Sequence, residues 1–355
     1  MTHMPTVKIG LLGLGHVGSA VADALRRNGN HFAVRTGAVP VITHVAVKHL
    51  HKPRRVTVDP DLLTDDTWRV VRDPSVDVII EAIGGVEPAA SYLTEALSRG
   101  KHVVTANKQL VSTRGRELTQ LAGAVGRVFA YEASVGAALP VIRVFKSHLV
   151  GDRVTAVTAV INGTSNFILS QMEIGRPFAI ALADAQTRGL AEPDPADDVT
   201  GRDAAAKLAI LIRLAFDVAA TAQTIVHRGI DTVSPADIAR ARSDDRRIRL
   251  LAVARRTNGM LAAGVFPASL PRDHPLAQLD DEENGLLVHS DLAGELFIRG
   301  RGAGGVATSS AILGDLASTV NSSTNGSPAV LQEVEILPLL ALEQEQAVSY
   351  AEVDA

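Results

Sequence analysis

Short apolar runs alternate with helix-like spacing over the first 140 residues. Residues 7–12 (VKIGLL) predict a buried strand, and residues 19–25 after a glycine-rich turn have the spacing of one helix face. A connection containing Gly and Asn precedes the next strand. Further predicted strands are 41–47, 76–82, 101–106 and 127–131, and further helices are 88–99 and 110–123. Strands that alternate with helices predict an α/β fold with a parallel, doubly wound sheet over residues 1–140.

The pattern changes after Pro140. Residues 141–149 predict a helix, residues 153–161 a strand, and several helices follow up to about residue 217. Strand patterns recur over 259–266 and 285–298, so residues 141–307 are expected to form an α+β domain with a mainly antiparallel sheet. Residues 308–320 predict a helix that completes the first domain, and residues 321–355 predict a flexible linker and an acidic tail.

Composition excludes several classes of function. The 35 Lys and Arg against 39 Asp and Glu give a net charge of −4, and aromatic residues make up 3%, so a nucleic-acid partner is not expected. The chain has no cysteine, so redox chemistry must use a bound cofactor. No apolar run reaches the roughly 18 residues of a membrane span. We therefore expect a cytoplasmic protein with a small-molecule substrate and no membrane partner.

A glycine-rich turn joins the first predicted strand to the first helix. Gly13 allows the tight turn, Gly15 lets the backbone approach a pyrophosphate, and Gly18 lets helix and strand pack closely. The positive end of the helix would face the phosphates. A strand–helix turn without a ligand is the alternative. The context favours a Rossmann dinucleotide-binding domain whose cofactor contacts are Gly13, Leu14, Gly15, His16, Val17 and Gly18.

The second predicted strand ends at Val47 without the carboxylate that would accept hydrogen bonds from the ribose 2′-hydroxyl of NAD. A basic cluster suited to a 2′-phosphate follows instead, made of Lys48, His49, Lys52, Arg54 and Arg55. This pattern favours NADP over NAD, with Lys48 as the first candidate contact. A solvated basic loop is the alternative.

Residues 191–207 combine five carboxylates with a lysine. The carboxylates would attract an ammonium group, and they belong to Glu192, Asp194, Asp197, Asp198 and Asp203. If Gly201 opens a helix, Asp203 and Lys207 lie at i and i+4 on one face. A poorly solvated lysine near carboxylates can exchange a proton with a substrate hydroxyl while hydride leaves the same carbon. A surface ion pair and a hard-cation site are the alternatives.

Two shorter segments carry further candidate chemistry. Lys108 follows a predicted strand at the carboxyl edge, where open α/β sheets gather their ligands, although Asn107 could simply cap the next helix. In the second domain, the amide and hydroxyl groups of Asn162, Gly163 and Thr164 could hold a substrate carboxylate or cap a helix.

Residues 105–108 (TANK), 162–167 (NGTSNF) and 191–207 together resemble homoserine dehydrogenase, and the resemblance includes 131–136 and 300–305 and extends to about Leu316. It implies reversible NAD(P)-dependent oxidation of L-homoserine to L-aspartate 4-semialdehyde, on the route to threonine and methionine. It also implies a homodimer, with residues 141–307 as the substrate-binding, catalytic and dimerisation domain.

The same resemblance implies roles for individual residues. Lys207 would be the principal proton-transfer residue and Lys108 its partner. Substrate-binding residues would be Glu192, Asp198, Asp203, Asn162, Gly163 and Thr164, and further cofactor contacts Thr105, Gly302 and Ala303. Residues 132–138 resemble the family's monovalent-cation loop, with Glu132, Val135 and Ala137 as sodium ligands. A plain domain hinge fits these last residues equally well.

Two departures from the family pattern affect these expectations. Leu190 stands where the family often has a tyrosine, so one polar substrate contact would be missing and substrate choice could differ. About forty residues follow Leu316, too few for a regulatory ACT domain, so feedback inhibition through that domain is not expected. A paralogue acting on a related amino alcohol or aldehyde is therefore one alternative. A non-catalytic nucleotide sensor is another, against which the intact Lys108, Glu192, Asp203 and Lys207 argue.

Overall fold

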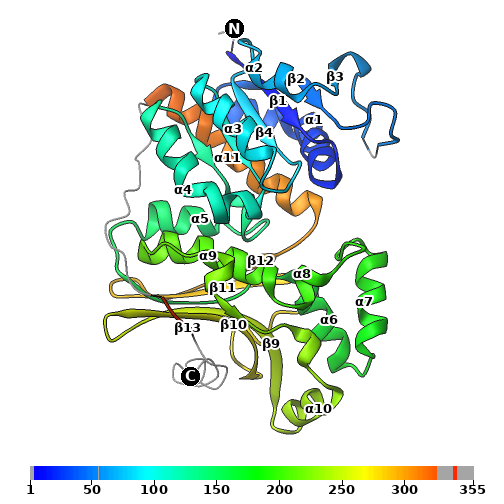
Figure 1. Cartoon of the computed structure of the whole chain (residues 1–355), viewed down its shortest axis with the longest axis vertical. Helices are drawn as coiled ribbons and strands as arrows, with labels where there is room; N and C mark the ends of the chain where they lie inside the picture. The colour runs from blue at the N-terminus through cyan, green and yellow to red at the C-terminus, as the bar shows by residue number, and fades with distance from the viewer. Residues whose placement is uncertain (1–3, 55, 326–338, 342–355) are drawn as a thin grey trace. The chain divides into compact units, whose positions relative to one another are not determined.

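The computed structural model describes residues 4–54, 56–325 and 339–341. These residues form two compact units (Figure 1). Unit 1 contains the described residues up to Ala138 together with the helix that begins at Gly305, and unit 2 contains Leu139–Gly304 and the short strand near the C-terminus. Arg55 of the predicted basic cluster and most of the predicted tail lie outside the described residues.

Unit 1 is built on a six-stranded parallel sheet in the order β3-β2-β1-β4-β5-β6. This is the strand order of dinucleotide-binding folds, and it confirms the α/β prediction. The strands are β1 (Thr6–Leu12), β2 (Val39–Ala46), β3 (Leu63–Thr64), β4 (Val78–Glu81), β5 (His102–Thr105) and β6 (Phe129–Ala130). The helices are α1 (His16–Thr36), α2 (Thr67–Arg72), α3 (Ala89–Ser98), α4 (Lys108–Ala124) and α11 (Gly305–Asn325), with 3-10 turns η1 (Pro60–Leu62) and η2 (Glu132–Ser134).

The core of unit 1 joins segments that are far apart in the sequence. Ile9 and Leu11 of β1 pack with Val21 of α1 and with Ile312 and Leu316 of α11, and all five are buried. Helix α11 therefore belongs to the N-terminal unit, where it is the orange helix among blue and cyan elements in Figure 1. Because parallel strands are buried on both faces, the sheet needs helices on each side.

Unit 2 contains a seven-stranded sheet in the order β12-β11-β7-β9-β10-β13, with β8 also paired to β10. Its pairs are antiparallel except those that β8 and β13 make with β10. The strands are β7 (Val154–Val160), β8 (Val226–His227), β9 (Arg246–Thr257), β10 (Met260–Pro271), β11 (Glu283–Ser290), β12 (Gly294–Arg301) and β13 (Leu339–Ala341). The mainly antiparallel second sheet confirms the remaining part of the predicted fold class.

Helices α6 and α9 of unit 2 pack on this sheet. The helices are α5 (Val141–Arg143), α6 (Gly163–Glu173), α7 (Phe178–Thr187), α8 (Ala196–Val199), α9 (Arg202–Phe216) and α10 (Pro235–Ser243). The 3-10 turns are η4 (Ala222–Thr224) and η5 (Ile230–Thr232), and η3 (Val144–His148) is a π-helical turn that continues α5. None of the helices that the structure describes has the length and hydropathy that a membrane span requires.

The structure corrects several predicted boundaries. Helix α1 continues through Gly29 to Thr36, because Phe32 and Ala33 keep an apolar face and Gly37 ends the helix in the left-handed conformation. Strand β9 was missed because its many arginines hide its apolar residues, although Leu250 to Ala254 are buried. The predicted strand 285–298 is a hairpin of β11 and β12. Residues 321–325 continue α11 instead of forming a linker, and 339–341 form a strand within the predicted tail.

Candidate functional site

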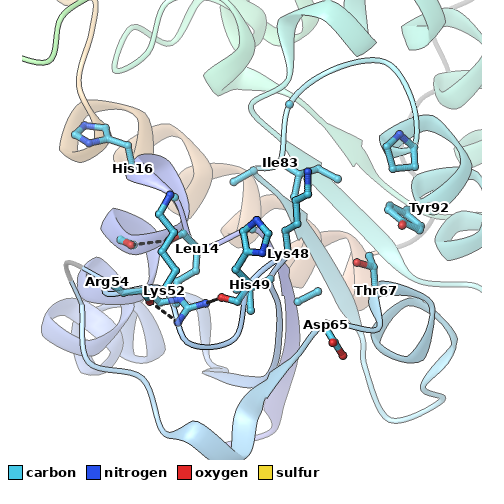
Figure 2. Close-up of a pocket in the computed structure, with 18 of the residues that line it drawn as sticks. Leu14, His16, Lys48, His49, Lys52, Arg54, Asp65, Thr67, Ile83 and Tyr92 are labelled. Atoms are coloured by element: carbon cyan, nitrogen blue, oxygen red, sulfur yellow. Dashed lines mark hydrogen bonds between the residues drawn. The ribbon is translucent and has the colours of Figure 1, made fainter. Parts of the chain in front are cut away.

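Unit 1 has a cavity of about 990 Å³ where β1, β2 and β4 end, which we call the glycine cavity. Its walls come from the glycine-rich turn, the loop after β2, the start of α2 and the loop between β4 and α3. Figure 2 shows Leu14 and His16 on one side of the cavity and Thr67 and Tyr92 on the other. The volume is at the upper end of the range for small-molecule and cofactor sites.

Three glycines make this cavity possible, each in a different way. Gly13 has φ +95°, and a Cβ there would lie 2.7 Å from the Ala82 carbonyl oxygen. A Cβ on Gly18 would lie 2.0 Å from the Gly13 carbonyl oxygen, so α1 could not pack as closely on the turn. Gly15 lines the cavity and would place a Cβ in open space. The turn therefore has the fit expected for a pyrophosphate, with backbone instead of side chains at the surface.

The loop 48–54 after β2, which we call the basic loop, supplies charge to the glycine cavity. Lys48, His49 and Lys52 are exposed and line it. Arg54 differs from them, because its guanidinium donates to the backbone carbonyl oxygens of Leu50, Lys52 and His49 within the same loop (Figure 2). The guanidinium therefore holds the loop together, and Arg54 is also part of the cavity wall. Asp65 is the carboxylate on the cavity wall.

Lys108 is the first residue of α4 and is half-buried. The Asn107 side chain caps this helix by accepting from the Leu110 N–H at 3.1 Å, as one alternative interpretation of TANK expected. Thr105, at the end of β5, is fully buried, and its hydroxyl donates to the Glu81 carboxylate. Capping and a role in chemistry are compatible, because the cap leaves Lys108 at the carboxyl edge of the sheet.

Unit 2 brings four predicted residues together in what we call the polar cluster: Asn162, Asp198, Asp203 and Lys207. The Asn162 amide donates to Asp198 Oδ1 at 2.7 Å and to Asp203 Oδ2 at 2.8 Å, while its carbonyl oxygen caps α6. Lys207 Nζ lies 2.9 Å from Asp203 Oδ2 and donates to the Ile161 carbonyl oxygen at 2.7 Å. A buried amide thus orders two carboxylates, and one of them pairs with the ammonium.

The sequence of α9 explains how Asp203 and Lys207 converge. Gly201 precedes the helix with φ +82°, so the helix begins at Arg202 and both charged residues share one face. The side chain of Asp203 is 1% exposed and that of Lys207 is 12% exposed. The pair is therefore not the solvated surface ion pair considered from the sequence. Among the described residues, no group of three or more His, Cys, Asp or Glu side chains could hold a metal ion.

The other predicted substrate residues lie around the start of α6 with different contacts. Gly163 is the first residue of this helix, and a Cβ there would lie 2.9 Å from the Glu282 carbonyl oxygen. The Thr164 hydroxyl donates to the Leu190 carbonyl oxygen at 2.8 Å. Glu192 is exposed, and its backbone oxygen accepts from the Gln186 amide at 3.2 Å. The structure thus joins Thr164 to Leu190, whereas the Glu192 hydrogen bond involves its backbone and not its carboxylate.

The remaining candidates belong to connections between elements. Gly302 lies in unit 2, where its N–H donates to the Glu282 carbonyl oxygen and a Cβ would clash with the Asn284 side chain at 2.0 Å. Ala303 follows it and is half-buried. Glu132, Val135 and Ala137 are all buried in unit 1, and Ala137 has φ +52°. Val17 and Gly18 support the glycine-rich turn from α1.

Two buried polar residues that organise these sites are not among the residues predicted from the sequence. Glu81 is fully buried at the end of β4, and Asn166 donates from its amide to three carbonyl oxygens in the segment 279–283 beside α6. A carboxylate that ends an otherwise apolar strand (VIIE) was a usable signal for Glu81. The signal for Asn166 was weaker, because an asparagine within a helix is ordinarily a solvent-exposed residue.

Comparison with known proteins agrees with this geometry. The family model for the homoserine dehydrogenase NAD-binding domain matches residues 13–132, and the homoserine dehydrogenase model matches residues 140–317. The homoserine dehydrogenase of Mycobacterium tuberculosis is 41% identical over 327 residues, which are 90% of this chain and 74% of that protein. The enzyme of Bacillus subtilis is 38% identical over 314 residues, 88% of this chain and 72% of that protein.

A solved structure extends the likeness to three dimensions. The crystal structure of a homoserine dehydrogenase from Thiobacillus denitrificans matches with a TM-score of 0.90 and 35% identity, covering 97% of this chain and 81% of that one. These comparisons do not support the paralogue or the nucleotide sensor. They confirm the resemblance seen in the sequence motifs, and they make the first unit a nicotinamide-dinucleotide domain. The chain belongs to the homoserine dehydrogenase family of oxidoreductases.

Proposed function

We propose that this chain oxidises L-homoserine reversibly to L-aspartate 4-semialdehyde and that Lys207 is the principal proton-transfer residue. The observation that carries the proposal is the polar cluster, in which a nearly buried lysine is held 2.9 Å from Asp203. A bound nicotinamide dinucleotide would accept the hydride. Lys207 in its neutral form, with Lys108 as its partner, would accept the proton of the substrate hydroxyl, and the resulting ammonium would return the proton in the reverse direction.

The same cluster supports recognition of an amino acid. The carboxylates of Asp198, Asp203 and Glu192 would bind the substrate ammonium group, because opposite charges attract strongly where water is scarce. The positive end of α6, at Gly163 and Thr164, would receive the substrate carboxylate. Asn162 would orient the two aspartates, since its side chain already bonds both of them and caps α6. Leu190 would leave that side of the substrate without a side-chain hydrogen bond.

We further propose that NADP is preferred over NAD. Lys48, His49 and Lys52 line the glycine cavity, and Arg54 holds their loop by three hydrogen bonds to its backbone. A 2′-phosphate carries a double negative charge near neutral pH, whereas a ribose hydroxyl carries none. Exposed lysines can therefore distinguish the two cofactors. Gly302 and Ala303 stay predicted cofactor contacts. Thr105 stays one through its backbone only, because its hydroxyl is fully buried and donates to Glu81.

A sodium ion at Glu132, Val135 and Ala137 is also part of the proposal. The donor set fits a hard cation, because it offers one buried carboxylate and backbone oxygens within a six-residue stretch. Its role would be structural, holding the backbone between β6 and α5. Exchanging sodium for a bulky organic cation should lower the melting temperature of the wild type but not that of Glu132→Gln. An equal effect on both proteins would remove the ion from the proposal. A homodimer and a cytoplasmic location stay predictions from the family resemblance.

The function is tested by mixing the purified protein with L-homoserine and either NADP or NAD at alkaline pH. Formation of reduced nicotinamide is followed by absorbance, and a panel of related amino alcohols is run in parallel. We expect turnover of homoserine, and faster turnover with NADP at subsaturating cofactor. Absence of turnover in a folded sample that binds NADPH would contradict the proposal, and faster turnover of another amino alcohol would favour the paralogue.

A further inference from the structure

Glu81 is a buried carboxylate for which the proposed mechanism has no role. It is 0% exposed and ends β4, whose other residues are the apolar Val78, Ile79 and Ile80. Burying a charge-bearing group among apolar side chains is costly unless hydrogen bonds compensate. The contacts of the carboxylate therefore indicate its purpose.

The Glu81 carboxylate receives three hydrogen bonds, two from the loop after β4 and one from the end of β5. Oε1 accepts from the backbone N–H groups of Ile83 at 2.8 Å and Gly84 at 3.0 Å. Oε2 accepts from the Thr105 hydroxyl, which in turn accepts from the Asn107 N–H at 3.0 Å. All of these groups lie within unit 1. An ionised carboxylate only accepts hydrogen bonds, so three converging donors suit it better than any neutral side chain.

One half of this network shapes the glycine cavity. Ile83 and Gly84 line the cavity, and Ile83 is visible on its wall in Figure 2. Gly84 and Gly85 have φ values of +76° and +75°, so the loop has a conformation that glycine adopts without strain but does not by itself enforce. The two bonds to Glu81 Oε1 select one of the many conformations open to the glycines.

The other half reaches the helix that carries Lys108. Asn107 donates from its amide to the Gly85 carbonyl oxygen at 2.6 Å and accepts from the Leu110 N–H, which caps α4. Lys108 is the next residue. The chain of bonds from Glu81 through Thr105 and Asn107 returns to Gly85, so the cavity wall and the start of α4 are held by one closed network.

We propose that Glu81 is a positioning residue that sets both the dinucleotide-binding loop 82–85 and, through Thr105 and Asn107, the start of α4 with Lys108. The part concerning Lys108 rests on the proposed function, whereas the part concerning the loop does not. The two halves predict different kinetic effects, because only one of them shapes the glycine cavity.

Four variants separate the effect on the loop 82–85 from the effect on the start of α4. Glu81→Gln can keep its amide oxygen toward Ile83 and Gly84 but turns an N–H group toward Thr105, so the Thr105 hydroxyl loses its acceptor, and Thr105→Val removes the hydroxyl alone. Both should lower kcat about fivefold to tenfold and leave the Kd for NADPH, measured by fluorescence, within about twofold. Glu81→Ala removes both halves and should raise that Kd about tenfold as well. Thr105→Ser, which keeps the hydroxyl, should restore most of kcat.

Matched controls distinguish positioning from general destabilisation. Thr119→Val removes a hydroxyl of α4 that bonds to Gly115. Asp73→Asn neutralises a carboxylate between α2 and β4, near the end of β4 that is opposite Glu81. Both should keep kcat and Kd. The proposal is overturned if folded Glu81→Ala and Thr105→Val keep wild-type kcat and Kd and lose only melting temperature. It is also overturned if Thr105→Val raises Kd without changing kcat, since the Thr105 hydroxyl would then contact the dinucleotide directly.

If Glu81→Ala does not fold, Glu81→Gln and Thr105→Val still decide the outcome. Their combination should be no worse than either alone, because both remove the hydrogen bond that the Thr105 hydroxyl donates to Glu81, and additive effects would contradict the network. Wild-type turnover of homoserine is measured first. Its failure would remove the proposed function, while the fluorescence assay would still test the loop.

Discussion

In the glycine cavity of unit 1, the groups that would meet a ligand are backbone atoms and exposed side chains, whereas in the polar cluster of unit 2 they are buried or half-buried side chains bonded to one another. Lys48 and Lys52 are exposed and free to adjust to a phosphate. Lys207 is 12% exposed and held by Asp203 and Ile161. A cavity that only binds tolerates adjustable charges, but a site that moves a proton gains from groups that are already oriented.

This contrast predicts that the largest loss of kcat follows from substitution of Lys207. Lys207→Met should lower kcat about 10²-fold to 10⁴-fold, the usual contribution of a positioned proton-transfer group, while the Kd for NADPH stays unchanged. Turnover assays with L-homoserine measure kcat, and fluorescence titration measures the Kd for NADPH.

The matched control is Arg202→Ala, one turn earlier in α9. Its guanidinium is 59% exposed and pairs with Asp197 at 2.9 Å, so its loss should change little. Because Lys207→Met leaves Asp203 buried without its cation, circular dichroism must show that the variant is folded. If folded Lys207→Met has the kcat of the wild type, the polar cluster does not transfer the proton, and the contrast with the glycine cavity is wrong.

The next largest effect is expected from the glycines of the cavity. Gly18→Ala should weaken NADPH binding at least tenfold and destabilise the protein by about 1–3 kcal/mol, because the new Cβ would lie 2.0 Å from Gly13 O. Gly15→Ala should weaken binding but leave the free energy of unfolding nearly unchanged, because nothing lies within 4 Å of its Cβ.

Gly29→Ala is the control for these glycines. It lies within α1, has no atom within 4 Å of a new Cβ, and should stabilise the helix by about 0.5–1 kcal/mol. Chemical denaturation and fluorescence titration measure both quantities. Equal destabilisation by Gly15→Ala and Gly18→Ala would contradict this prediction, because Gly15 would then also be needed for packing.

A third prediction concerns the pH dependence of the stability of unit 1, which should depend on a residue outside the glycine cavity. Burial and the nearby Arg127 lower the pKa of His102 from 6.5 to about 4, and its ring accepts from the Val128 N–H. The unfolded chain therefore binds more protons between pH 6.5 and 4. The contribution to stability is complete above pH 6.5 and is lost as pH falls, by up to about 3 kcal/mol.

Urea denaturation of the wild type and His102→Gln between pH 4.5 and 7.5 measures this effect. The variant should be less stable at pH 7.5 and should show a flatter dependence on pH. Parallel curves for the two proteins would mean that other groups cause the acid sensitivity. His102 begins β5, at the edge of the sheet opposite the cavity, so NADPH affinity at pH 7.5 should not change.

The smallest effect is expected in the basic loop. Lys48→Ala and Lys52→Ala should each weaken NADP binding about threefold to tenfold and leave NAD binding unchanged, and the loss should shrink at high salt. Arg99→Ala, an exposed cation of the same unit paired with Glu95, is the control. If both lysine variants bind NADP and NAD as the wild type does, the basic loop is a solvated surface.

Local patterns were enough to predict the framework. The glycine spacing, the apolar strands and the i and i+4 placement of Asp203 and Lys207 depend on neighbours in the sequence, and the structure has β1, the start of α1 and α9 where these patterns indicated. Strand β9 was not predicted, because its burial depends on contacts with residues that are distant in the sequence. Its arginines look solvent-exposed in the sequence, but Arg249 is fully buried because Glu173 and the carbonyl oxygens of Ala277 and Leu279 compensate it.

The sequence by itself therefore determined the fold class, the family and the residue types of both sites. Only the tertiary structure decided how those residues are used: Asn162 joins two aspartates from other helices, Arg54 bonds its own loop, and Glu81 links the loop after β4 to the end of β5. The reason is physical. Periodicity and turn chemistry act over a few residues, but the partners of a buried polar group come from segments that only folding brings together.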